Sequence, residues 1–314
     1  MRFPRGLNSL LLASALVSAL PAQAQAPRAG NAIVVAEMVE PLMAKWKDAY
    51  RSKHPGWDLS YASTLQDSVF KAFLAGQSLL APSARDFTRE EIAAFTAKWG
   101  YAPTRVAICM DGLVVLVHKS NPLKEIKIEQ LDAIYSTTRL QGWPKDIQVW
   151  GDLGLTTGNW ATRPIEVLGH PVGSGTRMFY LSAVQKNGTS KPTIQRGADI
   201  LEMVENLTAN QAAIGYGSMS QNYSSLRTVP VVPAGGKTAI EANPANIVEG
   251  AYPLGRILYT YVNQAPGKPL NANLLNFLRY ILSKDGQSQV TSAGFVPLAE
   301  DIAGINLRRL EAAR

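Results

Sequence analysis

The chain has 314 residues, of which 46% are hydrophobic and 18% are charged, and its formal net charge is +7. This balance is typical of a folded globular protein and excludes a disordered, collagen-like or coiled-coil chain, while the length suits one large domain or two lobes of roughly 100–200 residues each. The single cysteine, Cys109, excludes an internal disulfide framework and any metal site built from several cysteines.

The positive charge is spread along the chain. No run of Lys or Arg and no alternation of basic and aromatic residues is present, so we expect no nucleic-acid partner. The excess of positive charge is compatible with an anionic small molecule or a negatively charged surface nearby. Three histidines leave little material for a histidine-built metal centre, and we expect no metal and no cofactor.

Residues 1–26 have the pattern of a cleaved secretory signal. Arg2 and Arg5 precede the apolar stretch Leu10–Leu20, which is short for a membrane span, and Ala-Gln-Ala occurs twice between positions 22 and 26. No cysteine follows the cleavage sites, so no lipid anchor is expected. The pattern predicts a periplasmic protein that is secreted through a cleaved signal peptide.

The rest of the chain alternates between short apolar runs and helical periodicity. In chain order this predicts a strand at Ala32–Ala36, a helix from Pro41 to about His54, a strand at Leu59–Ser63, a helix at Thr64–Ala75, a helix at Ile92–Trp99 behind a Thr88/Glu91 capping box, a β-rich stretch Arg105–His118 broken at Asp111-Gly112, a helix at Ile128–Tyr135, a strand at Pro164–Leu168, a helix from Thr176 to Gln185, a helix at Ile200–Leu207, strands at Ala213–Tyr216, Thr228–Val232 and Ile257–Val262, and helices at Asn271–Leu282 and Asp285–Ala293.

This alternation predicts an α/β fold with mainly parallel sheets and crossover helices. Ligands bind such sheets beyond the carboxyl ends of the strands, where loops meet the N-termini of helices. Three junctions between a strand and a helix are therefore candidate ligand sites: Ala36–Pro41, Ser63–Gln66 and Leu168–Arg177.

The segment Gly173–Arg177 follows a predicted strand and opens a helix. Ser174 can cap the helix, Gly175 lets a ligand approach the backbone, and Ser174 and Thr176 add hydroxyl donors. The free N–H groups of the first turn and the permanent cation of Arg177 favour an oxyanion, and no metal is required. An ordinary capped helix start has the same pattern. The segment lacks the Gly-Lys-[Ser/Thr] of a Walker A loop and the G-x-S-x-G of a nucleophile elbow.

Gly173–Thr176 resembles the phosphate-binding loop of periplasmic phosphate-binding proteins, which are the solute-binding components of phosphate ABC transporters. The similarity extends in order from Ala32 to Pro297. It includes the segments Pro41–Trp46, Asn121–Leu123, Trp150–Leu153, Ala213–Tyr216 and Tyr252–Arg256.

The resemblance implies a two-lobed periplasmic binding protein fold of type II, with mainly parallel or mixed sheets, flanking helices and a ligand cleft between the lobes. Residues 27–116 and 256–314 would form the first lobe, and residues 117–255 the second. The resemblance also implies a monomer with no catalytic residues.

Several residues match the anion contacts of that family, and several depart from them. Ser174, Gly175 and Thr176 match the contacts of the second lobe, and Ser63 or Thr64 matches a serine of the first lobe. The departures are His170 where the family has an arginine, Val172 where it has an aspartate, Glu37-Met38 where it has a hydroxyl residue before an aromatic one, and Ala84, between Ser83 and Arg85, where it has a carboxylate.

Glu37 has three readings. It can accept the proton of a bound phosphate while Arg177 or Arg85 supplies the missing cation; it can recognise an amine or hydroxyl of another anionic solute; or it can point away as a solvated strand end. His170 is either a loop residue in solvent or part of the cleft. In the cleft it would raise affinity as the pH falls through about 6.5.

The resemblance thus leads us to expect a receptor that captures phosphate or a related oxyanion and delivers it to a membrane ABC permease. The alternative is a sensor or scaffold of the same fold that binds a different anionic solute or has lost anion binding. A hydrolase with Ser174 as nucleophile is disfavoured, because the histidine available as a base, His170, sits in the same short loop.

Overall fold

The computed structural model describes residues 32–57 and 59–312. The predicted secretory signal, residues 1–26, lies outside this range. Within the described residues, no helix is both long enough and apolar enough to cross a bilayer.

The helices start and end close to the predicted positions. The capping box is confirmed, because Glu91 N–H donates to Thr88 Oγ1 at 3.2 Å and Thr88 N–H donates to Glu91 Oε2 at 2.8 Å. The helices are α1 (Glu40–Lys53), α2 (Gln66–Ala75), α3 (Arg89–Trp99), α4 (Ile128–Tyr135), α5 (Gly175–Ala183), α6 (Ile200–Ala209), α7 (Pro244–Val248), α8 (Ala272–Leu282), α9 (Lys284–Ser292) and α10 (Glu300–Ala312), with 3-10 turns η1 (Glu37–Val39), η2 (Trp150–Leu153) and η3 (Gly158–Ala161).

The strands form where β-branched residues fill short apolar runs. One strand that the sequence pattern did not predict contains Pro82, and it is tolerated because that strand lies at the edge of its sheet. The strands are β1 (Ala32–Ala36), β2 (Ser60–Thr64), β3 (Leu80–Ser83), β4 (Thr104–His118), β5 (Ile126–Lys127), β6 (Glu166–Gly169), β7 (Gln195–Arg196), β8 (Ala213–Ser218), β9 (Leu226–Val229), β10 (Val231–Val232) and β11 (Gly255–Val262).

The central sheet is mixed. It has seven strands in the order β3-β11-β4-β8-β6-β7, and β9 also pairs with β4. The pairs β6–β7 and β6–β8 are parallel, as are β1–β2 and β5–β10 in two small separate sheets. The ladders that involve β4 or β11 are antiparallel. The expectation of mainly parallel sheets therefore holds for the strands joined by crossover helices and not for the long strands that traverse the molecule.

The predicted break at Asp111-Gly112 is wrong. β4 continues through both residues, with Asp111 opposite Arg256 and Gly112 opposite Gly255. Asp111 can remain in a buried strand because its carboxylate is paired with the guanidinium of Arg256. Gly112 provides space rather than a turn, since a Cβ at this position would lie 2.7 Å from Ile247 Cδ1.

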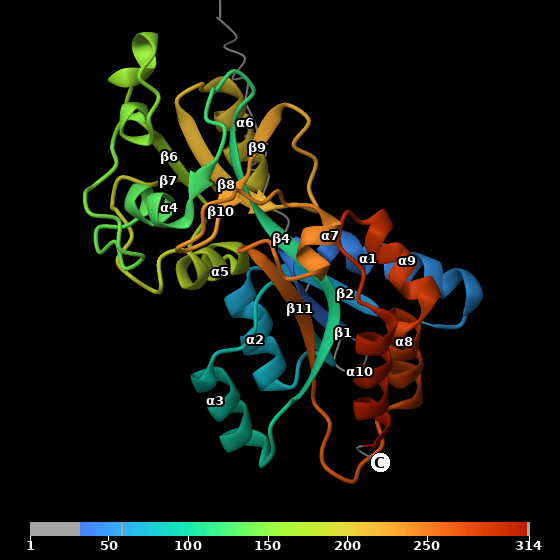
Figure 1. Ribbon diagram of the computed structural model, residues 1–314. Helices are drawn as coiled ribbons and strands as arrows, with labels where there is room; N and C mark the ends of the chain where they lie inside the picture. Colours follow the sequence, from blue (N-terminus) through green and yellow to red (C-terminus); the bar gives the residue numbers. More distant parts are fainter. Residues whose placement is uncertain (1–31, 58, 313–314) are drawn as a thin grey trace, which may run out of the picture.

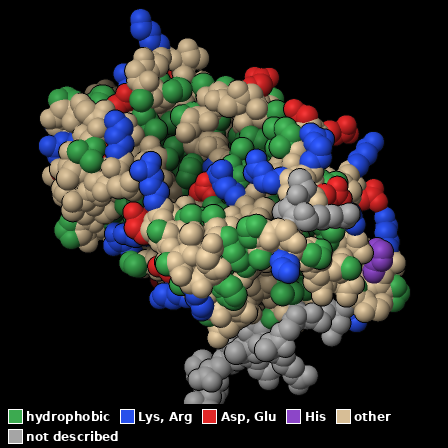
Figure 2. Space-filling view, turned by 90° about the horizontal axis from the view of Figure 1, so that it is seen from below, with side chains coloured by type: hydrophobic (Ala, Val, Ile, Leu, Met, Phe, Trp, Pro, Cys, Tyr) green, Lys and Arg blue, Asp and Glu red, His purple; other side chains and the backbone are tan. Residues whose placement is uncertain are grey.

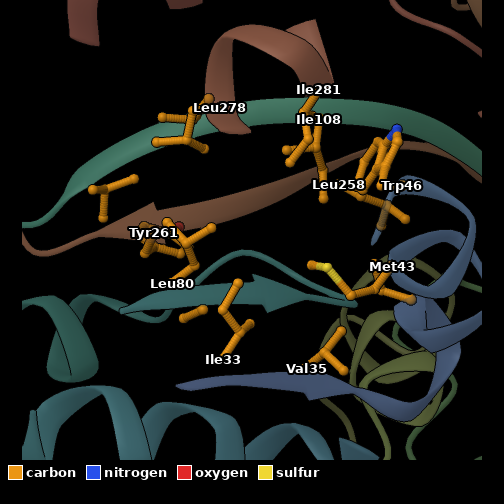
Figure 3. Packing of buried hydrophobic residues seen from close by; sticks show 14 of the residues in the cluster. Ile33, Val35, Met43, Trp46, Leu80, Ile108, Leu258, Tyr261, Leu278 and Ile281 are labelled. Carbon is orange, nitrogen blue, oxygen red and sulfur yellow. The ribbon is translucent and has the colours of Figure 1, made fainter. Parts of the chain in front are cut away.

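Two main hydrophobic cores lie at the two ends of β4. The first combines residues from both ends of the chain; in Figure 3, Ile33, Leu80 and Ile108 from β1, β3 and β4 face Leu258 of β11 and Leu278 of α8. The second core is built mainly from residues between Leu113 and Leu254.

The fold is therefore two-lobed, as expected. Figure 1 shows β4 and β11 running together from the lobe that carries α2, α3, α8 and α10 towards the lobe that carries α4, α6 and β8. The cores change over between Cys109 and Leu113 on β4, and between Leu254 and Leu258 at the start of β11. The exact boundaries 27–116, 117–255 and 256–314 stay a prediction.

Candidate functional site

The start of α5 presents unpaired backbone donors. Ser174 occupies the N-cap position with φ −68° and ψ 132°, and its side chain does not cap the helix, in contrast to the expectation. The first-turn N–H groups of Gly175, Thr176 and Arg177 have no partner within the helix, and no other described group satisfies them. Gly173 has φ +88°, which favours glycine and directs the chain into the helix. The positive end of α5 is thus free to meet an anion.

A cavity of about 210 Å³ adjoins this helix start and draws on both lobes. It lies beyond the carboxyl ends of β1, β6 and β8, where a ligand site is expected in an α/β protein. Its lining residues are Glu37, Met38, His170, Thr176, Asp199, Ile200, Leu201, Ser218 and Gln221. Four of the residues singled out from the sequence, Glu37, Met38, His170 and Thr176, therefore meet in one place.

Glu37 faces the second lobe, and it is not a strand end turned away from the protein. The Ser174 hydroxyl donates a hydrogen bond to its carboxylate. Glu37 keeps an exposed surface, yet its partial burial raises its pKa. The bond from Ser174 opposes this shift, and the negative charge of Asp199 adds to it. Two of the three readings remain open for Glu37: a proton acceptor for the anion, or a partner for an amine or hydroxyl.

His170 lines the cavity as a neutral side chain. It is 7% exposed, and its Nε2–H donates to the carbonyl of Tyr216 at 2.9 Å, because a carbonyl only accepts. Burial, with a smaller contribution from the positive charge of Arg256, lowers the pKa of His170 to about 4, although the bond to the Tyr216 carbonyl acts in the opposite direction. The expected gain of affinity as the pH falls through 6.5 is therefore corrected: His170 carries no charge at that pH and does not replace the arginine of the family.

Arg85 and Ser83 are engaged elsewhere. Arg85 donates to both carboxylate oxygens of Glu91, at 2.7 and 2.8 Å, and does not line the cavity. The Ser83 hydroxyl donates to the Ala81 carbonyl at 2.9 Å and accepts from Gln66. Arg85 is thus not available as the missing cation.

The other residues predicted from the sequence are not among those that line the cavity. Thr64 pairs with Ala36 in the β1–β2 ladder, and Ala36 directly precedes Glu37 in the chain. The neighbouring Ser63 is exposed. Arg177 is half-buried and forms no ion pair within the described residues. Gly175 packs against the other lobe, since a Cβ there would lie 2.5 Å from Ala84 Cβ. The two lobes therefore touch at the start of α5.

A buried ion pair next to the cavity was not predicted from the sequence. Arg256 donates from Nε and Nη2 to Asp111 Oδ2 at 2.9 and 2.7 Å, and both side chains are buried. Arg256 Nη1 donates to the Ala84 carbonyl at 2.9 Å in one lobe, and the guanidinium lies 4.7 Å from the ring centre of Phe179 in α5. The available signal was an aspartate inside the apolar run Val106–Val117 and an arginine at the start of the mainly apolar strand β11.

The ion pair connects directly to the cavity lining. Arg256 Nη2 lies 2.9 Å from Met38 Sδ, and the Ser218 hydroxyl donates to Asp111 Oδ1 at 2.6 Å. Each partner of the ion pair thus touches one lining residue. The charge of Arg256 also acts on the lining residue His170, whose pKa it helps to lower.

The side chains that line the cavity, together with the ion pair next to it, offer hydrogen-bond donors and charges. Within residues 32–57 and 59–312, no three His, Cys, Asp or Glu side chains come together in a metal-binding arrangement.

Comparisons with known proteins find similar sequences and structures over most of the chain. A family model described as a PBP superfamily domain matches residues 21–285. The chain is 33% identical over 307 residues to a phosphate-binding protein PstS from Pseudomonas aeruginosa PAO1, covering 97% of this chain and 95% of that protein. It is also similar to the crystal structure of a putative phosphate ABC transporter substrate-binding protein with bound phosphate from Clostridium perfringens, with a TM-score of 0.68, 25% identity and coverage of 86% and 100% of the two chains. A phosphate transport receptor from Vibrio cholerae has the same fold, with a TM-score of 0.66, 18% identity and coverage of 86% and 100%.

The buried neutral His170 predicts a loss of stability in acid. Its pKa is about 4 in the folded protein and about 6.5 when unfolded, so the unfolded chain binds more protons between these values and the free energy of unfolding falls as the pH drops below 6.5. His170→Gln keeps a donor for the Tyr216 carbonyl and removes the titration. Between pH 7 and pH 5, urea unfolding should show the wild type losing about 2 kcal/mol more than His170→Gln. A parallel decline of the two proteins would contradict the buried neutral imidazole.

Proposed function

Because this chain belongs to the PBP superfamily and, within it, to the family of phosphate-binding proteins, we propose that it captures phosphate or a related oxyanion between its two lobes and delivers it to a membrane ABC permease. The observation that carries the proposal is the uncapped first turn of α5, which opens on a cavity lined from both lobes. The bound phosphate of the Clostridium perfringens protein supports the same class of ligand.

Several donors converge on the proposed anion. The Thr176 side chain is 3% exposed, lines the cavity and has no hydrogen-bond partner among the described residues. The helix dipole contributes about 0.3–1 kcal/mol for a charge at this end, and each hydrogen bond to a charged oxygen contributes roughly 1.5–3 kcal/mol. In our proposal Arg256 supplies positive charge from behind the cavity, because it touches the lining residue Met38 and its charge acts on the lining residue His170.

Transport requires that the anion favour a closed arrangement of the lobes. Glu37 and Met38 come from one lobe, and Thr176 and His170 come from the other, so a ligand that touches both groups binds the closed state more tightly and shifts the population towards it. β4 and β11 are the connections that would bend. The paired glycines Gly112 and Gly255 lie where these strands pass between the two cores.

The remaining features of the proposal follow from the family. We place the protein in the periplasm as a monomer, after removal of residues 1–26 and without a lipid anchor. On the face drawn in Figure 2, Lys and Arg lie among Asp and Glu. The proposal includes no nucleic-acid partner. We propose no catalytic role for Ser174, because its hydroxyl is bonded to Glu37 and not to a histidine base.

Calorimetric titration with phosphate, arsenate and sulfate tests the proposal. We expect saturable binding of at least one of these anions. Thr176→Val removes the unpaired hydroxyl with little change of shape and should weaken that binding by about 1–3 kcal/mol. Thr208→Val on α6, whose hydroxyl bonds to the Val204 carbonyl away from the cavity, serves as the matched control. Unchanged affinity in Thr176→Val would remove this residue from the site, and no binding of any anion by the wild type would overturn the proposal.

A sensor or scaffold that has lost anion binding is the second candidate function. The observation that favours it is the Glu37 carboxylate, which already accepts from Ser174, a donor that the anion needs. An ionised carboxylate about 4 Å from a phosphate oxygen costs on the order of 4 kcal/mol at an effective dielectric of 20, which amounts to about three decades of affinity.

Glu37→Gln separates the two candidates. We expect it to weaken phosphate binding about tenfold, because the raised pKa of Glu37 makes its carboxylate a good acceptor for the proton of a bound phosphate and an amide cannot take that proton. Calorimetry at pH 7 measures the change, with the exposed Glu90→Gln on α3 as a control for the loss of one negative charge. Tighter binding of phosphate would contradict the role of Glu37 as proton acceptor and identify it as a repulsive group, as expected of the sensor or of a site whose solute carries a positive charge.

A further inference from the structure

The cavity between the lobes is larger than a bare phosphate requires. Its volume of about 210 Å³ is roughly seven times the ~30 Å³ that one water molecule occupies in the liquid, and covalently bonded atoms pack more closely than separate waters. A phosphate has five non-hydrogen atoms. The cavity therefore has room for a short organic group attached to the oxyanion.

Two carboxylates line the cavity without a basic partner. Glu37 and Asp199 form no ion pair within the described residues, and they lie close enough that the charge of Asp199 acts on Glu37. One Asp199 oxygen, Oδ1, caps α6 by accepting from Glu202 N–H at 3.0 Å, which leaves Oδ2 free. Two uncompensated carboxylates beside a bound anion repel it unless a positive charge lies between them.

Buried polar atoms in the same cavity point independently to a ligand. The Thr176 side chain is 3% exposed and has no partner among the described residues. His170 is 7% exposed and uses only Nε2, so Nδ1 remains as an acceptor. Buried groups of this kind are normally hydrogen-bonded, so their vacant positions fit the polar atoms of a bound solute.

Of the five other lining residues, Ser218 and Gln221 are polar, and Met38, Ile200 and Leu201 are apolar. Leu201 is 68% exposed, so its side chain offers an apolar surface to a ligand. A short hydrocarbon segment of a ligand would cover this surface, whereas an inorganic anion would leave it in water. The lining thus combines hydrogen-bond donors, two carboxylates and an apolar surface, which suits a molecule with a cationic end and an anionic end.

We propose that the solute is a zwitterion, an aminoalkyl phosphate or phosphonate, with its oxyanion at the start of α5, its carbon chain against Ile200 and Leu201, and its ammonium group between Glu37 and Asp199. This inference rests on the proposed function, because it uses the same anion site. It adds the class of ligand and assigns Asp199 as a specificity-determining residue.

The test compares phosphoethanolamine with ethyl phosphate, which lacks the amine, by calorimetric titration of the full mature chain at pH 7. We expect phosphoethanolamine to bind at least tenfold more tightly than ethyl phosphate. Asp199→Asn should reduce this preference at least fivefold, because asparagine keeps the helix cap and loses the charge. Glu205→Gln removes a charge from the same helix away from the cavity and should leave the preference as in the wild type.

Equal binding of the two esters, or a preference that survives Asp199→Asn, would overturn the inference. Inorganic phosphate binding more tightly than both esters would also overturn it and leave the proposed function standing. If the wild type binds none of the three compounds and none of the inorganic anions, the proposed function fails together with the inference.

Discussion

The structure depends on one buried ion pair, Asp111–Arg256, at the point where the chain passes between its lobes. The two residues face each other on β4 and β11, 145 positions apart in the sequence, and both are removed from water. Loss of one partner from such a pair costs about 3–5 kcal/mol, because a charge is left buried alone. The pair therefore fixes the register of the two crossing strands and holds the Ala84 carbonyl and the Phe179 ring beside them.

The same pair shapes the electrostatics of the candidate site. Burial, helped by the charge of Arg256, keeps His170 neutral, so a positive potential in the cavity comes from a guanidinium that does not titrate and not from a histidine switch. The uncapped turn of α5 adds backbone donors. Glu37 and Asp199 line the same cavity, so the site combines donors for an oxyanion with two carboxylates. This combination links the proposed capture of an oxyanion to the proposed preference for a zwitterion.

Local patterns in the sequence predicted those structural features that are determined by residues close together in the chain. The loop and helix at Gly173–Arg177, the capping box at Thr88 and the α/β alternation were predictable, because turn chemistry and periodicity act over a few residues. The two-lobed arrangement was expected from the family resemblance alone. The break at Asp111-Gly112 was wrong because a strand partner far along the chain satisfies the aspartate. Arg256 was not predicted as a source of positive charge, because its partner is also far away in the sequence. Arg85 was predicted as the missing cation, although the carboxylate of Glu91 binds it. The short strand β3 was missed because its Pro82 is acceptable only at a sheet edge.

The central claim is that the guanidinium of Arg256, oriented by Asp111, supplies the positive charge for the anion. The direct measurement is a calorimetric titration of the double variant Asp111→Asn/Arg256→Gln with whichever oxyanion the wild type binds most tightly. The double change leaves no unpaired buried charge, and a thermal melt verifies that the protein is folded. The account predicts affinity at least tenfold weaker than that of the wild type. Undiminished affinity in a folded double variant would show that the pair only joins the strands and that the anion is held without it.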